Sequence, residues 1–373
     1  MFIIRIKRRL IAILLILALV SGLGVYFLPQ MIEASSGSVH DNSNVDIGAQ
    51  LQQLFDKRNT ALQTENTDLM QSTFDSKHIY GAWAFEHEKE KMEYLHNWMA
   101  KQSITFTKIE STIVVRSSKP KGDGFYANVL VSTEYDYTYS NAPETSNLFR
   151  IGTYHYLEIK PSEQGWVITR EWYTDPLADS LNMDDLKLQQ MSAFILSGVP
   201  KDLSNLKQQR VNAVAYADKY CGAASTPEVG FKFNPKYRDY NPEGGDCANF
   251  ASQMLFEAGN FKKNTIWNYE KNAGSKTWIK ARNFNSYMTN SGRGSLIAYG
   301  SYDKVLKLSY NLMPGDYIAY EKKGVVCHIS VVTGLDSKGY ALVNSHNSDR
   351  YRVPWDLGWS ETGIKFYLVR VNY

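Results

Sequence analysis

The stretch that decides the fold is GGDCANFASQMLFEAG, from Gly244 to Gly259, because its apolar residues recur at the spacing of a helix. After Cys247 these residues are Phe250, Ala251, Met254, Leu255 and Ala258. Gly259 suits the position that follows a helix C-cap. Cys247 shares a helix face with Ala251 and Met254, so its side chain is expected to point toward the core on which the helix packs.

Cys247 has two interpretations. Cysteine is usually a small buried hydrophobe, but in the first turn of a helix it lies beside unpaired N–H groups and the positive end of the helix dipole. Both features ease ionisation of the thiol, and the thiolate is the nucleophile. Gly244 and Gly245 allow a tight turn and the close approach of a substrate backbone. Asp246 stands where it could cap the helix.

A nucleophilic cysteine needs a base within hydrogen-bond reach. His328 and His346 are the two histidines after residue 206. Strand alternation in VVCHISVVTG separates His328 from Cys327, which indicates a structural role for Cys327. Alone, His328 could be a satisfied core histidine. In the next strand, YALVNSH, Asn344 and His346 share a face, and either could orient the imidazole of His328; we favour His346.

These residues carry a resemblance to a known family. The stretches GGDCANFASQMLFEAG, MPGDYIAYEKKGVVCHISVVTG and YALVNSHNSD resemble the putative amidase domain of Gram-positive bacteria. That domain belongs to a papain-like group with the NlpC-type cell-wall peptidases and the cysteine/histidine-dependent amidohydrolases (CHAP). The resemblance covers roughly residues 206–373. Ala248 stands where family members commonly have Thr or Ser, a conservative change.

The resemblance implies an exported cysteine amidase or peptidase that acts on peptidoglycan or another amide, with no cofactor and no metal. The catalytic cysteine and histidine fall on Cys247 and His328, and the third position falls on His346. The group commonly completes its oxyanion hole with a polar or aromatic residue. Tyr237 or Tyr240 could supply or position that donor beside the backbone N–H of Cys247.

The N-terminus carries the clearest targeting signal. Leu10–Leu28 is an uncharged stretch that follows Arg5, Lys7, Arg8 and Arg9, and its length is just enough to cross a bilayer of about 30 Å. It is either a membrane anchor or a cleaved signal peptide, which predicts an extracytoplasmic protein. The formal net charge is +3 and no dense basic stripe follows the first ten residues, so nucleic-acid binding is not expected.

The first half predicts an α+β domain. Helical patterns from about Val45 to Ser103 precede four strand-like runs. The apolar or aromatic positions that alternate in three of these runs are Phe125, Ala127, Val129, Val131, Tyr135, Tyr137 and Tyr139, then Phe149, Ile151, Leu157 and Ile159, then Trp166, Ile168 and Trp172. The element order is similar to the nuclear-transport-factor-2-like, or cystatin-like, fold. His87, Glu88, Glu90 and His96 are better explained as a solvated helix face than as a metal site.

The predicted fold class is α+β, with an accessory domain before a papain-like domain whose nucleophile helix packs on an antiparallel sheet. The predicted divisions are a signal anchor or peptide at 1–29, a linker at 30–46, the accessory domain at 47–180, a helical linker at 181–205 and the amidase domain at 206–373. Phe261–Tyr302, with Trp267 and Trp278, could wall the substrate groove or be an ordinary loop. Nothing in the spacing supports a Cys221–Cys327 disulfide.

Three other functions compete with a hydrolase. One is a cell-wall-binding or scaffold protein whose papain-like domain has lost turnover. Another is a thiol redox protein, although the chain lacks a C-x-x-C pair. The third is a transferase that uses the same acyl-enzyme as a hydrolase does, and only tests with acceptor molecules would separate those two.

Overall fold

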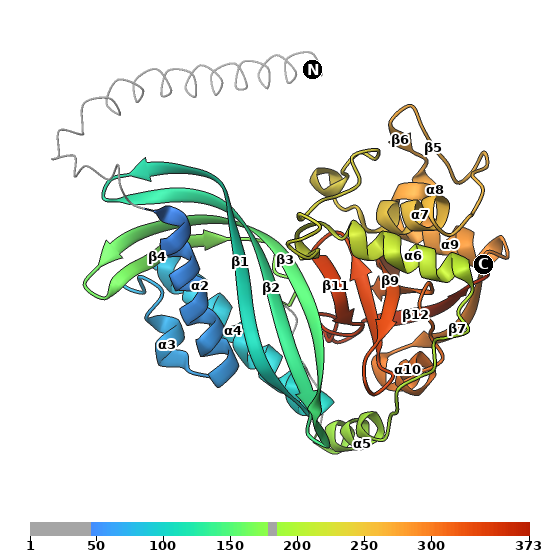
Figure 1. The fold of residues 1–373 in the computed structure, drawn as a ribbon, viewed down its shortest axis with the longest axis horizontal. Coiled ribbons are helices and arrows are strands. Elements are labelled where there is room, and N and C mark those ends of the chain that lie inside the picture. The colour runs from blue at the N-terminus through green and yellow to red at the C-terminus, as the bar shows by residue number, and fades with distance from the viewer. Residues whose placement is uncertain (1–45, 178–184) are drawn as a thin grey trace, which may run out of the picture. The chain divides into compact units, whose positions relative to one another are not determined.

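The structure is a computed structural model that describes residues 46–177 and 185–373 (Figure 1). The predicted anchor or signal segment at Leu10–Leu28 lies outside these residues and stays a prediction. Within the two described ranges, no helix has both the length and the apolarity that crossing a membrane requires.

The first half forms helices and then an antiparallel meander, as the sequence predicts. The helices are α2 (Ile47–Thr64), α3 (Thr67–Gln71) and α4 (Ile79–Gln102), and the strands are β1 (Ile104–Lys121), β2 (Gly124–Tyr139), β3 (Ala142–Ser162) and β4 (Gly165–Trp172). Asp46 starts α2, because its side chain accepts a hydrogen bond from the backbone N–H of Ala49 at 3.1 Å. Each strand pairs with the next in antiparallel register.

The alternation predicted along β2 and β3 is confirmed, since every apolar position named for these two strands is buried. The prediction for β4 is wrong at Trp172, whose exposed fraction is 67%. The reason is a register shift: Ile168 pairs with Ile159, but Arg170 pairs with Glu158, so one extra residue lies between them. Such a bulge moves every later side chain to the other face of the strand.

The second half alternates helices with strands. Its helical elements are α5 (Asp185–Leu196), α6 (Gln208–Lys219), η1 (Gly222–Ala224), η2 (Asn241–Glu243), α7 (Cys247–Glu257), α8 (Lys276–Ile279), α9 (Ala281–Asn290) and α10 (Tyr302–Ser309). Its strands are β5 (Tyr269–Glu270), β6 (Ala273–Gly274), β7 (Gly294–Gly300), β8 (Tyr317–Lys322), β9 (Val325–Leu335), β10 (Ala341–Ser345), β11 (Asp349–Pro354) and β12 (Lys365–Val371). The predicted helix α7 and the predicted strands β9 and β10 are confirmed.

One antiparallel sheet runs through both halves. Its order is β1-β2-β3-β11-β10-β9-β8-β12-β7, with β4 paired to β3 (Figure 1). The joint is the pairing of β3 with β11, in which Gly152 lies opposite Asp349. A Cβ atom on Gly152 would lie 2.3 Å from the backbone carbon of Ala223, so only glycine fits this joint. Residues Asp46–Tyr373 therefore form one compact unit, and the predicted domain boundaries stay predictions.

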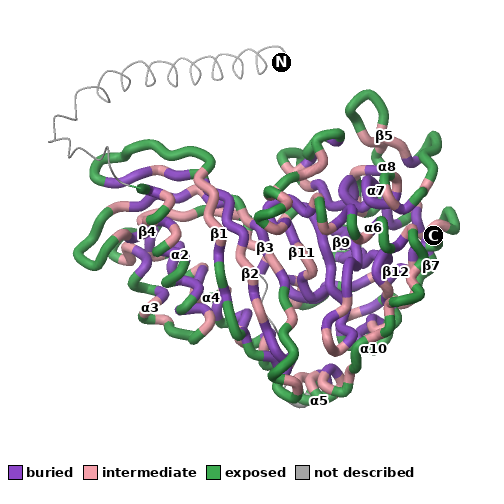
Figure 2. Tube along the Cα trace, viewed as in Figure 1, coloured by how far each residue is buried: buried purple, intermediate pink, exposed green. Residues whose placement is uncertain are grey.

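The C-terminal part of the sheet is covered on both faces. On one face, α6, α7 and α9 share a buried cluster with Ile329 and Val331 of β9. On the other face, His328 of β9 lies opposite Tyr320 of β8, whose ring stacks on Trp359. Because both faces are covered, β9 (Figure 2) is buried along nearly its whole length, and β10 is buried throughout.

Candidate active site

Cys247 is the first residue of α7, and its side chain is buried with those of Ala251 and Met254, as predicted. Its exposed fraction is 5%. Asp246 holds the N-cap position, but its side chain makes no capping hydrogen bond, so the suggested cap is wrong. Instead its Oδ1 accepts hydrogen bonds from the backbone N–H of Tyr240 at 3.0 Å and from the side chain of Asn249 at 2.7 Å.

The Cys247 thiol is harder to ionise than its place in a helix suggests. Burial raises its pKa to about 12, because the core solvates a thiolate poorly. A hydrogen bond from the backbone N–H of Ile329, and one from that of Ala248, offset only part of this rise, and the carboxylate of Asp246 adds to it. The sulfur therefore carries its proton at neutral pH, which corrects the expected ease of ionisation.

His328 is also buried and uncharged. Its ring lies 5.1 Å from that of Trp359 at an interplanar angle of 29°, and it also contacts Tyr320. Burial lowers its pKa to about 3, and the nearby positive charge of Arg350 adds to this effect. Its Nε2 is buried and has no hydrogen-bond partner among the residues that the structure describes. A buried polar atom without a partner is uncommon and needs an explanation.

Cys247 of α7 lies against β9 beside the backbone of His328, but the two side chains share no hydrogen bond within the described residues. The Cys247 sulfur accepts the N–H of Ile329, which follows His328 in the chain. Successive side chains of a strand point to opposite faces, so the imidazole and the side chain of Ile329 diverge. Within residues 46–177 and 185–373, no hydrogen bond joins the thiol to the imidazole.

His346 pairs with Asp246 and does not reach His328. Its Nδ1 lies 2.7 Å from Oδ2 of Asp246, and its Nε2 lies 2.6 Å from the backbone oxygen of Tyr220. Burial alone would lower its pKa, but the hydrogen bond to Asp246 and the carboxylate charge raise it above the usual value. Two acceptors at the two ring nitrogens fit an imidazolium ion. Since both nitrogens are engaged, the predicted role of orienting His328 is not met by these contacts.

Asn344, the alternative third residue, is occupied elsewhere. Its Oδ1 accepts hydrogen bonds from Thr333 Oγ1 at 2.6 Å and from the backbone N–H of Arg352 at 2.7 Å. Its Nδ2 donates to Asp218 at 2.9 Å. The amide thus connects β9, β11 and α6, and this structural role gives it no contact with His328.

Neither tyrosine suggested for the oxyanion hole offers its hydroxyl to Cys247. Tyr237 donates its hydroxyl hydrogen bond to Glu257, at the far end of α7. The hydroxyl of Tyr240 accepts the backbone N–H of Gly274 at 2.9 Å. Tyr240 is still linked to the site, because its own backbone N–H binds Asp246.

Two further expectations are corrected. Trp267 and Trp278 do not wall an open groove, because both are fully buried against α7. Their indole N–H groups donate to Ser252 at 3.0 Å and Asn249 at 2.8 Å. Cys327, expected to be structural, is exposed, and none of the three cysteines forms a disulfide.

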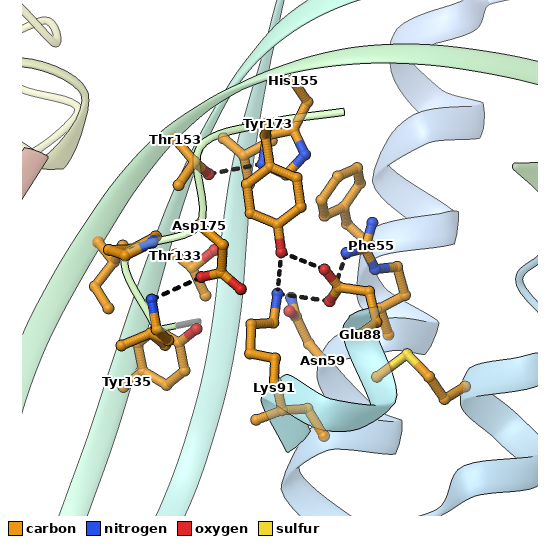
Figure 3. A pocket seen from close by; sticks show the side chains of 17 residues that line it. Phe55, Asn59, Glu88, Lys91, Thr133, Tyr135, Thr153, His155, Tyr173 and Asp175 are labelled. Carbon is orange, nitrogen blue, oxygen red and sulfur yellow. Dashed lines mark hydrogen bonds and ion pairs between the residues drawn. The ribbon is translucent and has the colours of Figure 1, made fainter. Parts of the chain in front are cut away.

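A second polar cluster lies inside the first half, between α2, α4 and the curved strands (Figure 3). Arg58 Nη2 lies 2.7 Å from Glu88 Oε2, and its Nη1 lies 2.9 Å from Glu171 Oε1. Lys91 also contacts Glu88, at 2.5 Å. Glu88 is thus buried between two cations, so the expected solvated helix face is wrong at this residue. Hydrophobic periodicity has no signal for a buried ion pair, which explains why the sequence missed it.

Residues 207–369 match the family model described as "putative amidase domain". This segment is similar to that family. The match suggests hydrolysis of an amide bond as the class of reaction, and the matched segment contains α7, β9 and β10. No curated protein matches the chain.

Similarity to solved structures is low. The intermembrane-space region of the chloroplast protein ARC6 is 11% identical, with a TM-score of 0.24, over 34% of this chain and 95% of that one. A putative calcium/calmodulin-dependent kinase II association domain from Exiguobacterium sibiricum is 16% identical, with a TM-score of 0.21, over 34% and 90%. An LEH-like epoxide hydrolase of M. tuberculosis is 11% identical, with a TM-score of 0.16, over 34% of this chain and 84% of that one.

Proposed function

We propose that the chain hydrolyses an amide bond of peptidoglycan, with Cys247 as the nucleophile and His328 as the base. One observation carries the proposal. The Cys247 sulfur accepts a hydrogen bond from the backbone N–H of Ile329, the residue after His328. The imidazole Nε2 of His328 has no hydrogen-bond partner among the described residues. Both residues lie in the segment that matches the amidase family. The imidazole lies on the face of β9 opposite the sulfur, so joining the two groups requires a local shift of the β9 backbone and not a rotamer change alone.

The two groups start uncharged, because burial keeps the proton on the sulfur and off the imidazole. His328 takes the thiol proton as the Cys247 sulfur attacks the amide carbonyl carbon. The carbon–nitrogen bond then breaks, and the imidazolium gives its proton to the leaving amine. Water attacks the thioester next; its proton passes through His328 to the sulfur, and a carboxylic acid is released. The N–H of Cys247, at the start of a helix, supports a role in binding the oxyanion.

The papain-like resemblance supports peptidoglycan as the substrate. A thiol at a helix start, a histidine on a strand and a polar residue on the next strand follow that group's order. The predicted export segment at Leu10–Leu28 would bring the domain to the cell wall, outside the cytoplasm. Asp246 and His346 then act through position: their pairing ties β10 to the start of α7.

The test compares the full chain with its Cys247→Ala variant, each incubated with purified peptidoglycan, and identifies soluble products by mass spectrometry. The proposal predicts fragments with new amine and carboxyl ends that form only with the intact cysteine. Equal fragments from both chains would remove Cys247 from the reaction. Cys327→Ser is the matched control, since it alters the exposed cysteine and is expected to leave the products unchanged.

A specific observation favours a second function, a wall-binding protein without turnover. Cys247 and His328 have exposed fractions of 5% and 3%, and no hydrogen bond joins them in the described residues. A protein of this kind would sediment with peptidoglycan and release nothing from it. The same incubation separates the two functions, because both products and sedimentation are measured in it.

A further inference from the structure

Several large aromatic side chains are exposed near the edge of the first half. The exposed fractions are 67% for Trp172, 61% for Trp83, 48% for Tyr80 and 47% for Tyr154. Trp172 is exposed because of the bulge in β4, which turns it to the same face as Tyr156, its pairing partner on β3. Side chains of this size are normally covered, and a group of them marks a binding surface.

Trp172 lines two hollows. The first, of about 450 Å³, lies between α4 and the end of β4 and includes Tyr80, Trp83, His87 and Arg170. The second, of about 410 Å³, is lined by Thr153, Tyr154, Asn347 and Asp349, among others. Both β4 and β11 pair with β3, β4 at Tyr156 and β11 at Gly152. The second hollow lies along the edge of β3 between these two strands. A shared tryptophan makes the two hollows neighbours.

The second hollow also adjoins the candidate active site. Asn347, part of its wall, packs against Gly245, where a Cβ atom would lie 2.9 Å from the Asn347 side-chain nitrogen. Gly245 has a φ of +135° and directly precedes Asp246 and Cys247. A molecule in the second hollow would therefore lie beside the turn that positions the nucleophile.

We propose that the two hollows form one track for the glycan strand of the substrate, with its sugar rings stacked on Trp83 and Trp172. This inference rests on the proposed function, because it names the polymer part of that substrate. Seven of the eight residues that line the first hollow are aromatic or polar, and Ala84 is the single aliphatic one. Flat apolar faces beside polar groups suit a sugar ring, which has C–H faces and hydroxyl edges; a groove for an apolar helix would be lined by aliphatic side chains.

Polar groups in the walls of both hollows suit a hydroxyl-rich ligand. The guanidinium of Arg170 lies 3.9 Å over the ring of Tyr80, and its Nη1 lies 3.4 Å from Glu158 Oε1. This donor stands in the wall of the first hollow. In the second hollow, the carboxylate of Asp239 adds acceptors for hydroxyl or amide hydrogens and disfavours an anionic membrane surface.

The test measures binding in the Cys247→Ala background, so that turnover has no part in it. The full chain is titrated with peptide-free glycan strands purified from peptidoglycan, and affinity is measured by calorimetry. Trp83→Ala and Trp172→Ala are each expected to weaken binding at least tenfold, whereas Trp172→Phe, which keeps an aromatic face, should recover part of the loss. Leu296→Ala is the matched control, because Leu296 has an exposed fraction of 53% on β7, at the opposite end of the sheet.

The proposal is overturned if the parent chain does not bind the strands, or if both tryptophan variants bind them as tightly as it does. Loss of binding in Leu296→Ala as well would show a general defect and would also count against a defined track. Failure of the amidase proposal looks different: glycan binding that depends on the tryptophans would persist while wild-type chain releases no fragment. Products without tryptophan-dependent binding would reject the track and keep the enzyme.

Discussion

His346 Nδ1 lies 2.7 Å from Oδ2 of Asp246, although 100 positions separate the two residues in the sequence. This contact fixes the start of α7, and with it Cys247, to the end of β10. Phe250 stacks on the imidazole with ring centroids 4.0 Å apart, which closes the contact to water. The nucleophile is thus held from two sides: by the Asp246–His346 pair, and by the backbone N–H of Ile329 on β9.

The pKa of His346 is expected to exceed its ordinary value of about 6.5. A histidine whose pKa is higher in the folded than in the unfolded chain stabilises the fold. This stabilisation is complete at a pH below the pKa in the unfolded chain, and it is lost as the pH rises through the pKa in the folded chain. The stability difference between wild type and His346→Gln should therefore be larger at pH 5.5 than at pH 8.5, values chosen on either side of about 6.5. Urea unfolding of both chains measures this difference, and NMR titration of the His346 ring measures its pKa. A pKa below that of a free histidine would contradict the prediction.

Thiol labelling should follow exposure and pKa. With a pKa of about 12, only about one Cys247 in ten thousand is a thiolate at pH 8, compared with about a quarter of free cysteines. Iodoacetamide is therefore expected to modify the exposed Cys327 long before the buried Cys247 and Cys221. Peptide mapping by mass spectrometry at timed points reports the order. Labelling of Cys247 as fast as Cys327 would show a preformed thiolate.

The buried cluster around Arg58 should be sensitive to the loss of one charge. Glu88→Gln removes the carboxylate that lies 2.7 Å from Arg58 and 2.5 Å from Lys91. Because removing one partner of a buried ion pair leaves an uncompensated charge, we expect a loss of about 3–5 kcal/mol in the free energy of unfolding. Glu110→Gln is the control, since Glu110 pairs with Lys108 at the surface and should change stability little. Equal effects in urea unfolding would contradict the prediction.

The joint between the two halves of the sheet depends on Gly152. In Gly152→Ala the new Cβ atom meets the backbone of Ala223 and Ala224 at 2.3–2.4 Å, so the joint must shift. Overpacking of this kind typically costs about 1–3 kcal/mol. Gly334→Ala is the matched control, because the nearest atom there lies at 3.8 Å, an ordinary contact. Thermal unfolding of both variants checks the prediction, which fails if their melting temperatures agree.

The sequence correctly predicts helices and strands whose buried side chains recur at a fixed spacing. The alternation in β2 and the apolar face of α7 are both borne out, because each residue in these elements sees the same kind of neighbour at a fixed period. At Thr169 one extra residue breaks this period in β4, and the exposed Trp172 is the result. No local pattern signals such a bulge.

The candidate site was predictable only as a set of residues. Cys247 and His328 stand out by residue type and by their order in the chain. Whether their side chains meet depends on which face of β9 packs against α7. The pairing of Asp246 with His346 depends on contacts between distant segments, which spacing along the chain does not encode. The same holds for burial, which reverses the expected ionisation of Cys247.

The most direct measurement is the initial rate of amide cleavage in peptidoglycan by wild type, Cys247→Ala and His328→Ala, each as the full chain, with released amines quantified. The account predicts that each variant loses at least about a thousandfold in rate, since nucleophile and base act as a unit. The double variant should be no slower than either single one. A His328→Ala chain that keeps the wild-type rate, or a Cys247→Ala chain that does so, would contradict the account.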